Sequence, residues 1–288
     1  MGSRFADKVA VVTGAGRGIG RGVALLLAEE GASVVANDLG CEVDGSGASH
    51  APADRVVEEI RSRGGNAVAS YDDVALMEGG EKLVGTTLDS YGRLDVLVNS
   101  VAVLRDRPIH DMTPQEFDVV IRNNVKGTFV PTRYAAIQFR QQRSGRIVNM
   151  TSDAGLEGVG RSNYAASSEA IVGLTRTVAR DMGKYGVTCN AVCPVAKTRL
   201  FPVATDGPFP TQEAWEGPGA PDDPENVAPL AVLLCTEAVP DVNGYTFGVR
   251  GGSVYVYSSP SVQRSVHKWG AFTMDEMDAL GPTTIGAP

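Results

Sequence analysis

Short apolar segments rich in β-branched residues alternate along the chain with longer segments in which apolar residues recur at helical spacing. The short segments predict buried strands at residues 9–12, 33–36, 67–70, 96–98, 147–150 and 188–192. The longer segments predict helices at residues 18–30, 53–63, 79–91, 113–142 and 164–185. This alternation favours right-handed crossovers and a parallel sheet covered on both faces, which is the doubly wound (Rossmann-type) α/β fold. We expect a single domain over residues 1–260, a C-terminal extension over 261–288, and ligand binding where the strands end.

Two segments interrupt the alternation. Residues 41–50 form an insertion rich in Gly and Ser, and residues 200–223 are rich in Pro and Gly and contain Trp215. The second segment is either a lid over a pocket or a plain surface loop. The acidic residues at 222–225 predict the start of a helix, and TMDE at 273–276 predicts a capping box that opens a short helix in the extension.

Composition narrows the classes of partner. The chain of 288 residues carries a formal charge of -8, which would repel nucleic acids and anionic membranes, so we expect a small-molecule substrate. No apolar run approaches the roughly 18 residues of a membrane span, and no signal-like segment opens the chain, which predicts a cytoplasmic protein. The cysteines show no CxxC pair and no histidine at metal spacing. We therefore expect no metal site and expect buried free thiols at Cys41, Cys189, Cys193 and Cys235.

A glycine-rich turn, TGAGRGIG at residues 13–20, joins the first predicted strand to the first predicted helix. Such a turn lets backbone N–H groups and the positive end of the helix approach a diphosphate, because no side chain blocks the way. Asp38 ends the second strand, eighteen residues after Gly20, where a carboxylate can accept hydrogen bonds from the ribose hydroxyls of adenosine. Its charge would repel a 2′-phosphate, so Asp38 predicts NAD rather than NADP. Arg17 is the opposing signal, since it could either pair with a 2′-phosphate or be solvated.

These features belong to a longer pattern. The chain resembles the short-chain dehydrogenase/reductase family over nearly its whole length, through the order and spacing of TGAGRGIG at 13–20, DDV at 72–74, NSVA at 99–102, NNV at 123–125, Ser152 and Tyr164. More narrowly, it resembles the dehydrogenase module of multifunctional enzyme type 2 and similar bacterial enzymes through NDLG at 37–40, ADRVVEEIRSRGG at 53–65, LRDRPI at 104–109 and CPVAKTR at 193–199. That resemblance implies an NAD-dependent enzyme acting on (3R)-hydroxyacyl-CoA thioesters and related carbonyls.

The resemblance also assigns roles to residues. In this family a tyrosine hydroxyl exchanges a proton with the substrate oxygen, a serine hydrogen-bonds the same oxygen, and an asparagine carries a proton-relay water. Tyr164, Ser152 and Asn124 match these roles. Thr151 has the family's thirteen-residue spacing to the tyrosine, but Ser152 leads into Asp-Ala-Gly as the family's serine does and is preferred. The nicotinamide cofactor would contact Gly14, Arg17, Gly18, Ile19, Gly20, Asp38, Asp73, Val74, Asn99, Tyr164, Pro194 and Thr198.

The catalytic set departs from the family at one position, where Ser168 replaces the lysine that follows the tyrosine by four residues. Residues i and i+4 share a helix face, so a lysine there would lie beside Tyr164 and lower the pKa of its phenol from about 10. Ser168 cannot do that, and Glu169 would raise the pKa if it pointed inward. Neither Lys126 nor Lys184 is placed to substitute.

The missing lysine leaves three interpretations open. The first is an NAD-dependent oxidoreductase that compensates for the lysine. The second is a non-redox enzyme, such as a lyase, dehydratase, isomerase or cyclase, that uses Tyr164 and Ser152 as acid and hydrogen-bond donor. The third is a catalytically silent binding subunit.

Pocket walls are expected from residues 103–107, 153–162 and 200–223. Their Val, Leu, Phe and Trp side chains suit a bulky, partly apolar substrate such as an acyl thioester, a polyketide or a steroid. As in the resembled family, the helices at 113–142 and 164–185 would pair between subunits of a homotetramer or homodimer.

Overall fold

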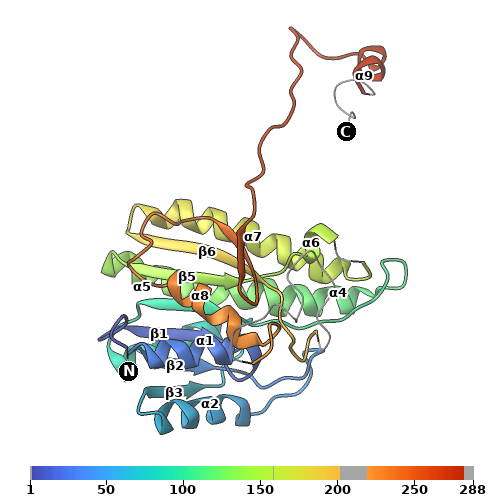
Figure 1. Cartoon of the computed structure of the whole chain (residues 1–288). Helices are drawn as coiled ribbons and strands as arrows, with labels where there is room; N and C mark the ends of the chain where they lie inside the picture. The colour runs from blue at the N-terminus through green and yellow to red at the C-terminus, as the bar shows by residue number, and fades with distance from the viewer. Residues whose placement is uncertain (1, 158, 202–218, 282–288) are drawn as a thin grey trace. The chain divides into compact units, whose positions relative to one another are not determined.

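Eight strands form one sheet in the structure, a computed structural model that describes residues 2–157, 159–201 and 219–281. The strands are β1 (Val9–Thr13), β2 (Ser33–Asn37), β3 (Asn66–Ser70), β4 (Val96–Asn99), β5 (Gly145–Met150), β6 (Val187–Pro194), β7 (Thr246–Arg250) and β8 (Ser253–Val256). Their order is β3-β2-β1-β4-β5-β6-β7-β8, and all are parallel except β8, which runs antiparallel to β7 (Figure 1). The predicted doubly wound parallel sheet is therefore confirmed. The apolar pattern does not predict β7 and β8. In the edge strand β8, half-buried and exposed residues alternate, so the strand is not one continuous buried segment.

Helices cover both faces of this sheet. They are α1 (Gly18–Glu29), α2 (Ala51–Ser62), α3 (Met77–Tyr91), α4 (Pro114–Val120), α5 (Gly127–Gln142), α6 (Ala154–Glu157), α7 (Ser162–Gly183) and α8 (Ala228–Leu233), the last preceded by a 3-10 turn at Pro224–Val227. Successive residues of a strand point to opposite faces, and β1 shows this directly. Ala10 and Val12 pack in a core cluster with α1, α2 and α8, whereas Val11 packs in a second cluster with α3, α5 and α7.

The segment 113–142, predicted as one helix, is divided in the structure. A π-helical segment, η1 (Ile121–Lys126), separates α4 from α5. A π turn accommodates one more residue than an α turn, so it rotates the side chains that follow. The two buried asparagines of this segment, Asn123 and Asn124, are thereby turned inward. The apolar spacing alone does not reveal this change of pitch, although such segments are frequent at functional sites.

The chain divides into two units, Met1–Tyr257 and Ser258–Pro288. In the second unit α9 (Met274–Leu280) begins with the predicted capping box, because Glu276 N–H donates to the Thr273 hydroxyl and Thr273 N–H donates to the Glu276 carboxylate. Most of the predicted lid or loop falls at 202–218, outside the described residues. Within the described part of the chain, every helix is too short or too polar to cross a membrane; the cytoplasmic location stays a prediction.

A buried carboxylate fixes the ends of the two central strands. Asp95 precedes β4, and its Oδ2 accepts the backbone N–H of Val9 at 2.9 Å, at the start of β1. Arg93 donates to both oxygens of the same carboxylate, at 2.8 Å and 2.7 Å. Asp95 thus holds β1 and β4 in register at their amino-terminal ends. These lie opposite the carboxyl ends of the strands, which carry ligands in this fold.

Replacing Asp95 with alanine should lower the free energy of unfolding by about 2–3 kcal/mol, because a charged acceptor is lost and the Val9 N–H is left buried without a partner. Asp89→Ala is the matched control, since Asp89 is exposed on α3, and a surface change of this kind should stay within about 0.5 kcal/mol. Urea denaturation followed by circular dichroism measures both values. Equal stabilities of the two variants would contradict the anchoring role of Asp95.

Candidate functional site

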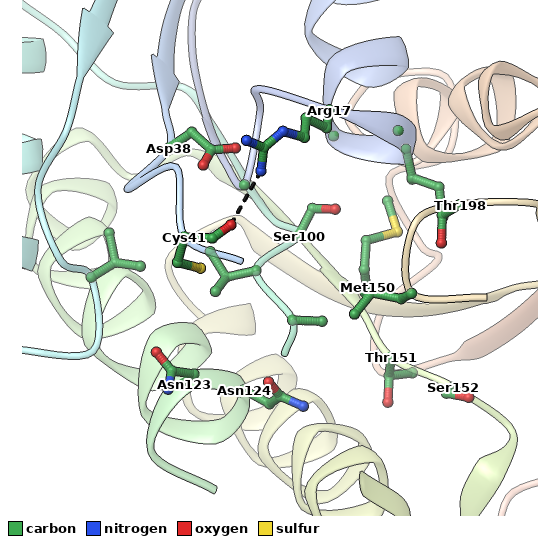
Figure 2. A pocket seen from close by; sticks show the side chains of 18 of the residues that line it. Arg17, Asp38, Cys41, Ser100, Asn123, Asn124, Met150, Thr151, Ser152 and Thr198 are labelled. Carbon is green, nitrogen blue, oxygen red and sulfur yellow. Dashed lines mark hydrogen bonds between the residues drawn. The ribbon is translucent and has the colours of Figure 1, made fainter. Parts of the chain in front are cut away.

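A cleft lies at the carboxyl ends of β1, β2, β4, β5 and β6. Figure 2 shows its wall, with Arg17 and Asp38 at one end and Asn124, Thr151 and Ser152 at the other. The cleft brings together all but one of the predicted site residues, namely Gly14, Arg17, Gly18, Ile19, Gly20, Asp38, Asp73, Val74, Asn124, Ser152, Tyr164, Ser168, Pro194 and Thr198.

Asn99 is the exception. Its amide nitrogen donates to Thr132 Oγ1 at 3.0 Å and to Asn149 Oδ1 at 2.8 Å, so the side chain ties β4 to α5 and β5 behind the wall of the cleft. It is almost fully buried and does not line the cleft. The neighbouring Ser100, Val101 and Ala102 line it instead.

The glycine-rich turn forms the floor of one end of the cleft. Gly14 has a φ of 64°, and a Cβ there would lie 2.5 Å from the carbonyl oxygen of Ser100, which follows β4. A Cβ at Gly20 would lie 2.2 Å from the carbonyl oxygen of Gly14. Glycine is therefore required at both positions, and α1 begins in the cleft without a side-chain cap on its first turn. These uncapped N–H groups fit the diphosphate of a dinucleotide.

Asp38 lies beside this turn with its carboxylate fixed by two backbone groups. Gly16 N–H donates to Oδ2 at 2.8 Å and Gly40 N–H donates to Oδ1 at 2.7 Å. A carboxylate oxygen can accept more than one hydrogen bond, so both oxygens retain capacity for a ligand. Asp73, on the next strand connection, is held in the same way by Ala75 N–H and by Arg122, whose guanidinium lies 2.6 Å from Oδ2.

Tyr164 lies at the other end of the cleft in an apolar cluster with Val103 and Val120. Burial raises the pKa of its phenol to about 12, while a hydrogen bond with Ser152 and the charge of Arg161 act in the lowering direction. The phenol is therefore neutral at pH 7. Thr151, by contrast, donates its hydroxyl to the Ser168 carbonyl at 2.8 Å, which leaves Ser152 as the hydroxyl beside the phenol.

Ser168 is buried and its hydroxyl does not reach the phenol. It donates to the backbone carbonyl of Tyr164 at 2.8 Å, one helical turn back. Asn124 is also occupied: it accepts Val103 N–H at 2.8 Å, and its amide donates to the Val103 carbonyl and to Ser167 Oγ, both at 3.2 Å. This amide fixes the loop after β4 against α7.

No lysine from the described ranges lines the cleft. Lys126 and Lys184 are both exposed and lie outside it, as expected from the sequence. Glu169 is exposed too, and its side chain lies against Gly155 of α6 rather than toward the phenol. Ser168, which occupies the position of the family's lysine, thus supplies neither a positive charge nor a second acid to Tyr164.

Two residues from the segments expected to form pocket walls lie near Tyr164. The ring of Phe201 meets the ring of Tyr164 edge-on, with 5.7 Å between centroids, and the guanidinium carbon of Arg161 lies 4.9 Å from the Phe201 centroid. Arg161 also donates to Asp106 at 2.9 Å. In the sequence, Arg161 lies in the expected wall segment 153–162 and one helical turn before Tyr164.

The insertion at 41–50 is part of the site. Leu104 N–H donates to the Val43 carbonyl at 2.9 Å, and Gly45 packs against Val103 and Asn123. Cys41 lines the cleft and is only half-buried, so the expectation of a buried thiol is wrong at this position. Cys189, Cys193 and Cys235 are buried as expected, and burial raises the pKa of each to about 12. The described residues hold no group of metal-binding side chains.

Comparison with known proteins places this cleft in a family context. The short chain dehydrogenase family model matches residues 8–201. A short-chain type dehydrogenase/reductase of Mycobacterium tuberculosis is 40% identical over 279 residues, covering 93% of this chain and 94% of that protein. The hydroxyacyl-CoA dehydrogenase ChsB1 of the same organism is 38% identical over 269 residues, covering 90% and 82%.

The mouse peroxisomal multifunctional enzyme type 2 is 42% identical over 250 residues, which cover 86% of this chain and 32% of that enzyme. The chain thus spans about a third of the mouse enzyme. Among solved structures, a short chain dehydrogenase from Mycobacterium avium superposes with a TM-score of 0.84 at 38% identity, covering 98% of this chain and 95% of that one.

Proposed function

Because the chain belongs to the short-chain dehydrogenase family and is an oxidoreductase of that family, we propose that it transfers hydride between NAD and a hydroxyl or carbonyl group of a bulky, partly apolar substrate. The observation that carries the proposal is that Tyr164 and Ser152 line one end of a cleft whose other end is the glycine-rich turn. A proton donor and a dinucleotide cradle share one cavity.

The cradle supports a nicotinamide dinucleotide, the cofactor class of this family. When bound, the nicotinamide supplies or accepts the hydride. The chain's own residues orient it: Gly14 and Gly20 keep the backbone free of side chains, and α1 points its uncapped first turn at the diphosphate. Asp38 favours NAD over NADP, since its fixed carboxylate can accept from ribose hydroxyls and repels a 2′-phosphate.

Tyr164 and Ser152 are proposed to act on the substrate oxygen. A neutral phenol can donate a proton to an oxygen that gains negative charge during reduction, while the Ser152 hydroxyl hydrogen-bonds the same oxygen. Oxidation in the opposite direction needs the phenolate as base. With a pKa of about 12, the phenol carries its proton at pH 7 and little phenolate is present. This protonation state favours reduction as the faster direction.

The pocket wall supports an apolar substrate. Val103, Val120 and Phe201 surround the Tyr164 ring, and Leu104 packs against the same cluster. The name of the relative ChsB1 describes a hydroxyacyl-CoA dehydrogenase. An acyl thioester with a 3-hydroxy or 3-oxo group is therefore the substrate class we favour within the wider set of acyl, polyketide and steroid-like molecules.

A non-redox reaction on the same site is the second candidate. It is favoured by one observation: the family's lysine position holds Ser168, whose hydroxyl is bound to a backbone carbonyl and cannot tune the phenol. A lyase, dehydratase, isomerase or cyclase would need Tyr164 only as a neutral acid, which is the state that burial enforces.

Replacing Ser168 with lysine should separate these candidates. In an oxidoreductase the new charge should speed alcohol oxidation and move its pH profile to lower pH, because it favours the phenolate, while reduction should gain less. Ala166→Lys is the control, since Ala166 is exposed on the same helix. Each variant is assayed for NADH absorbance and for product mass.

Tyr164→Phe completes this set and should reduce the reaction by about 100- to 10,000-fold in either case. Product formation without any change in NADH, in wild type and in Ser168→Lys, would replace the redox proposal with the non-redox one. An unchanged rate in Tyr164→Phe would show that the reaction centre lies elsewhere.

The cofactor preference gives a separate prediction. Isothermal titration calorimetry should find NADH bound at least about tenfold more tightly than NADPH, a difference of about 1.4 kcal/mol. Asp38→Asn keeps the size and removes the charge, so it should narrow the gap. Equal or reversed affinities in wild type would assign the choice to Arg17, and absence of binding to both would remove the redox proposal.

Assembly is also predicted from the outer surface of the helix pair. The exposed side of α5 carries Phe129 and Ile137, which are 43% and 47% exposed, and α7 exposes the small residues Ala170 and Gly173. Pairing of these helices between subunits would bury the apolar groups. We expect light scattering to report a dimer or tetramer. Ile137→Lys should shift the oligomeric state toward monomer. The control Leu76→Lys, at the exposed residue before α3, should leave the oligomeric state unchanged. A wild-type monomer at micromolar concentration contradicts the prediction.

A further inference from the structure

Two arginines from distant parts of the chain converge on one neutral acceptor in the cleft. Arg17 Nη1 donates to the Cys41 carbonyl oxygen at 3.2 Å, a contact visible in Figure 2, and Arg199 Nη1 donates to the same oxygen at 2.8 Å. Arg17 belongs to the glycine-rich turn, Cys41 begins the insertion, and Arg199 follows β6. Because both nitrogens contact one atom, the two guanidinium groups lie within a few ångströms of each other.

This arrangement places two positive charges close together. Across residues 2–157, 159–201 and 219–281, no carboxylate comes within ion-pair distance of either guanidinium, whereas Arg21, Arg63 and Arg122 each form an ion pair. Asp38 is nearby, but its carboxylate forms no ion pair with either guanidinium and accepts the N–H groups of Gly16 and Gly40 instead. A single carbonyl dipole does not neutralise two cations, so the pair favours an anion.

The place of the pair identifies the kind of anion. Both arginines line the cleft, and Arg17 immediately precedes Gly18, the first residue of α1, whose N-terminus carries partial positive charge. The loop of Arg199 touches the same turn, since a Cβ at Gly18 would lie 3.6 Å from Thr198 Cγ2. Guanidinium groups match the geometry of phosphate oxygens, and two of them can hold one phosphate group or two adjacent ones from both sides.

We propose that Arg17 and Arg199 form a clasp that binds phosphate groups of a ligand across the mouth of the cleft. The inference deepens the proposed dinucleotide site but concerns binding alone, so it does not depend on hydride transfer. Two ligands supply this chemistry: the diphosphate of the cofactor, which α1 also faces, and the phosphates of a coenzyme A thioester entering from the insertion side. The clasp also gives the insertion a role, because the Cys41 carbonyl holds both side chains in place before the ligand arrives.

Calorimetry on single and double variants tests the clasp. Arg17→Gln and Arg199→Gln each remove a charge and keep a polar side chain, and Arg180→Gln, on the exposed last turn of α7, is the matched control. The probes are ADP-ribose, which has the diphosphate without nicotinamide, and free coenzyme A. We expect each cleft variant to weaken one probe about tenfold and the double variant to weaken it by more, as for charge-assisted hydrogen bonds. The wild-type affinity should also fall more steeply with salt than that of the double variant.

The two probes separate the sources of phosphate. Loss of ADP-ribose affinity assigns the clasp to the cofactor, loss of coenzyme A affinity assigns it to the substrate, and Arg17→Lys and Arg199→Lys should recover part of either loss. Thermal denaturation of each variant checks that folding is unchanged. The inference is overturned if neither probe loses more affinity in the cleft variants than in Arg180→Gln, or if wild type binds neither probe. Intact NADH binding in the double variant would overturn a cofactor clasp and leave the proposed function standing.

Discussion

The position in the sheet where the strand order reverses determines where the crevice of this molecule opens. After β3 the chain crosses back over β1 to form β4 on its other side, so the connections that leave β1 and β4 diverge and open a crevice at their carboxyl ends. Glycine in the turn after β1 lets the two connections approach closely at their base, because Gly14 packs against the carbonyl of Ser100, the first residue after β4. Asp95 fixes the opposite ends of the same two strands. The groups of the candidate site lie around this crevice, on strand ends and on the helical segments η1 and α7.

Burial of one phenol sets the chemistry that the crevice can support. Tyr164 is surrounded by Val103, Val120 and Phe201, and taking a phenolate out of water disfavours its charge, which is why the pKa rises to about 12. A nearby ammonium would offset this desolvation. The chain instead places a hydroxyl at that position and directs it to the backbone. The nearby cation Arg161 contacts the Phe201 ring and is paired with Asp106. The site therefore keeps an acid and lacks a ready base.

The sequence predicts those features that rest on local pattern. The buried strands are continuous apolar runs, and the glycine-rich turn, Asp38 and Tyr164 stand at fixed distances from them, so their meeting in one cleft follows from the fold. Features that depend on tertiary packing are not predicted. The π-helical pitch at 121–126 leaves the apolar spacing nearly unchanged, β8 is an edge strand with one exposed face, and Phe201 and Arg161 meet Tyr164 only because the loop after β6 folds back over α7. Asn99 differs from the other residues of the predicted cofactor set, since its side chain does not line the cleft and donates to Asn149 in the sheet.

The distribution of charge along the cleft connects these observations. At the end where phosphates would lie, two guanidinium groups and a helix N-terminus act together without a carboxylate in ion-pair contact among the described residues. At the end where the reaction would occur, no unpaired cation among the described residues lies beside the Tyr164 phenol. The insertion joins the two ends, because its first carbonyl holds both arginines while Val43 and Gly45 contact the loop after β4. Such a cleft can bind a phosphorylated ligand tightly without stabilising a phenolate. The charges that face phosphate groups and the groups that set the acidity of the phenol thus belong to different residues.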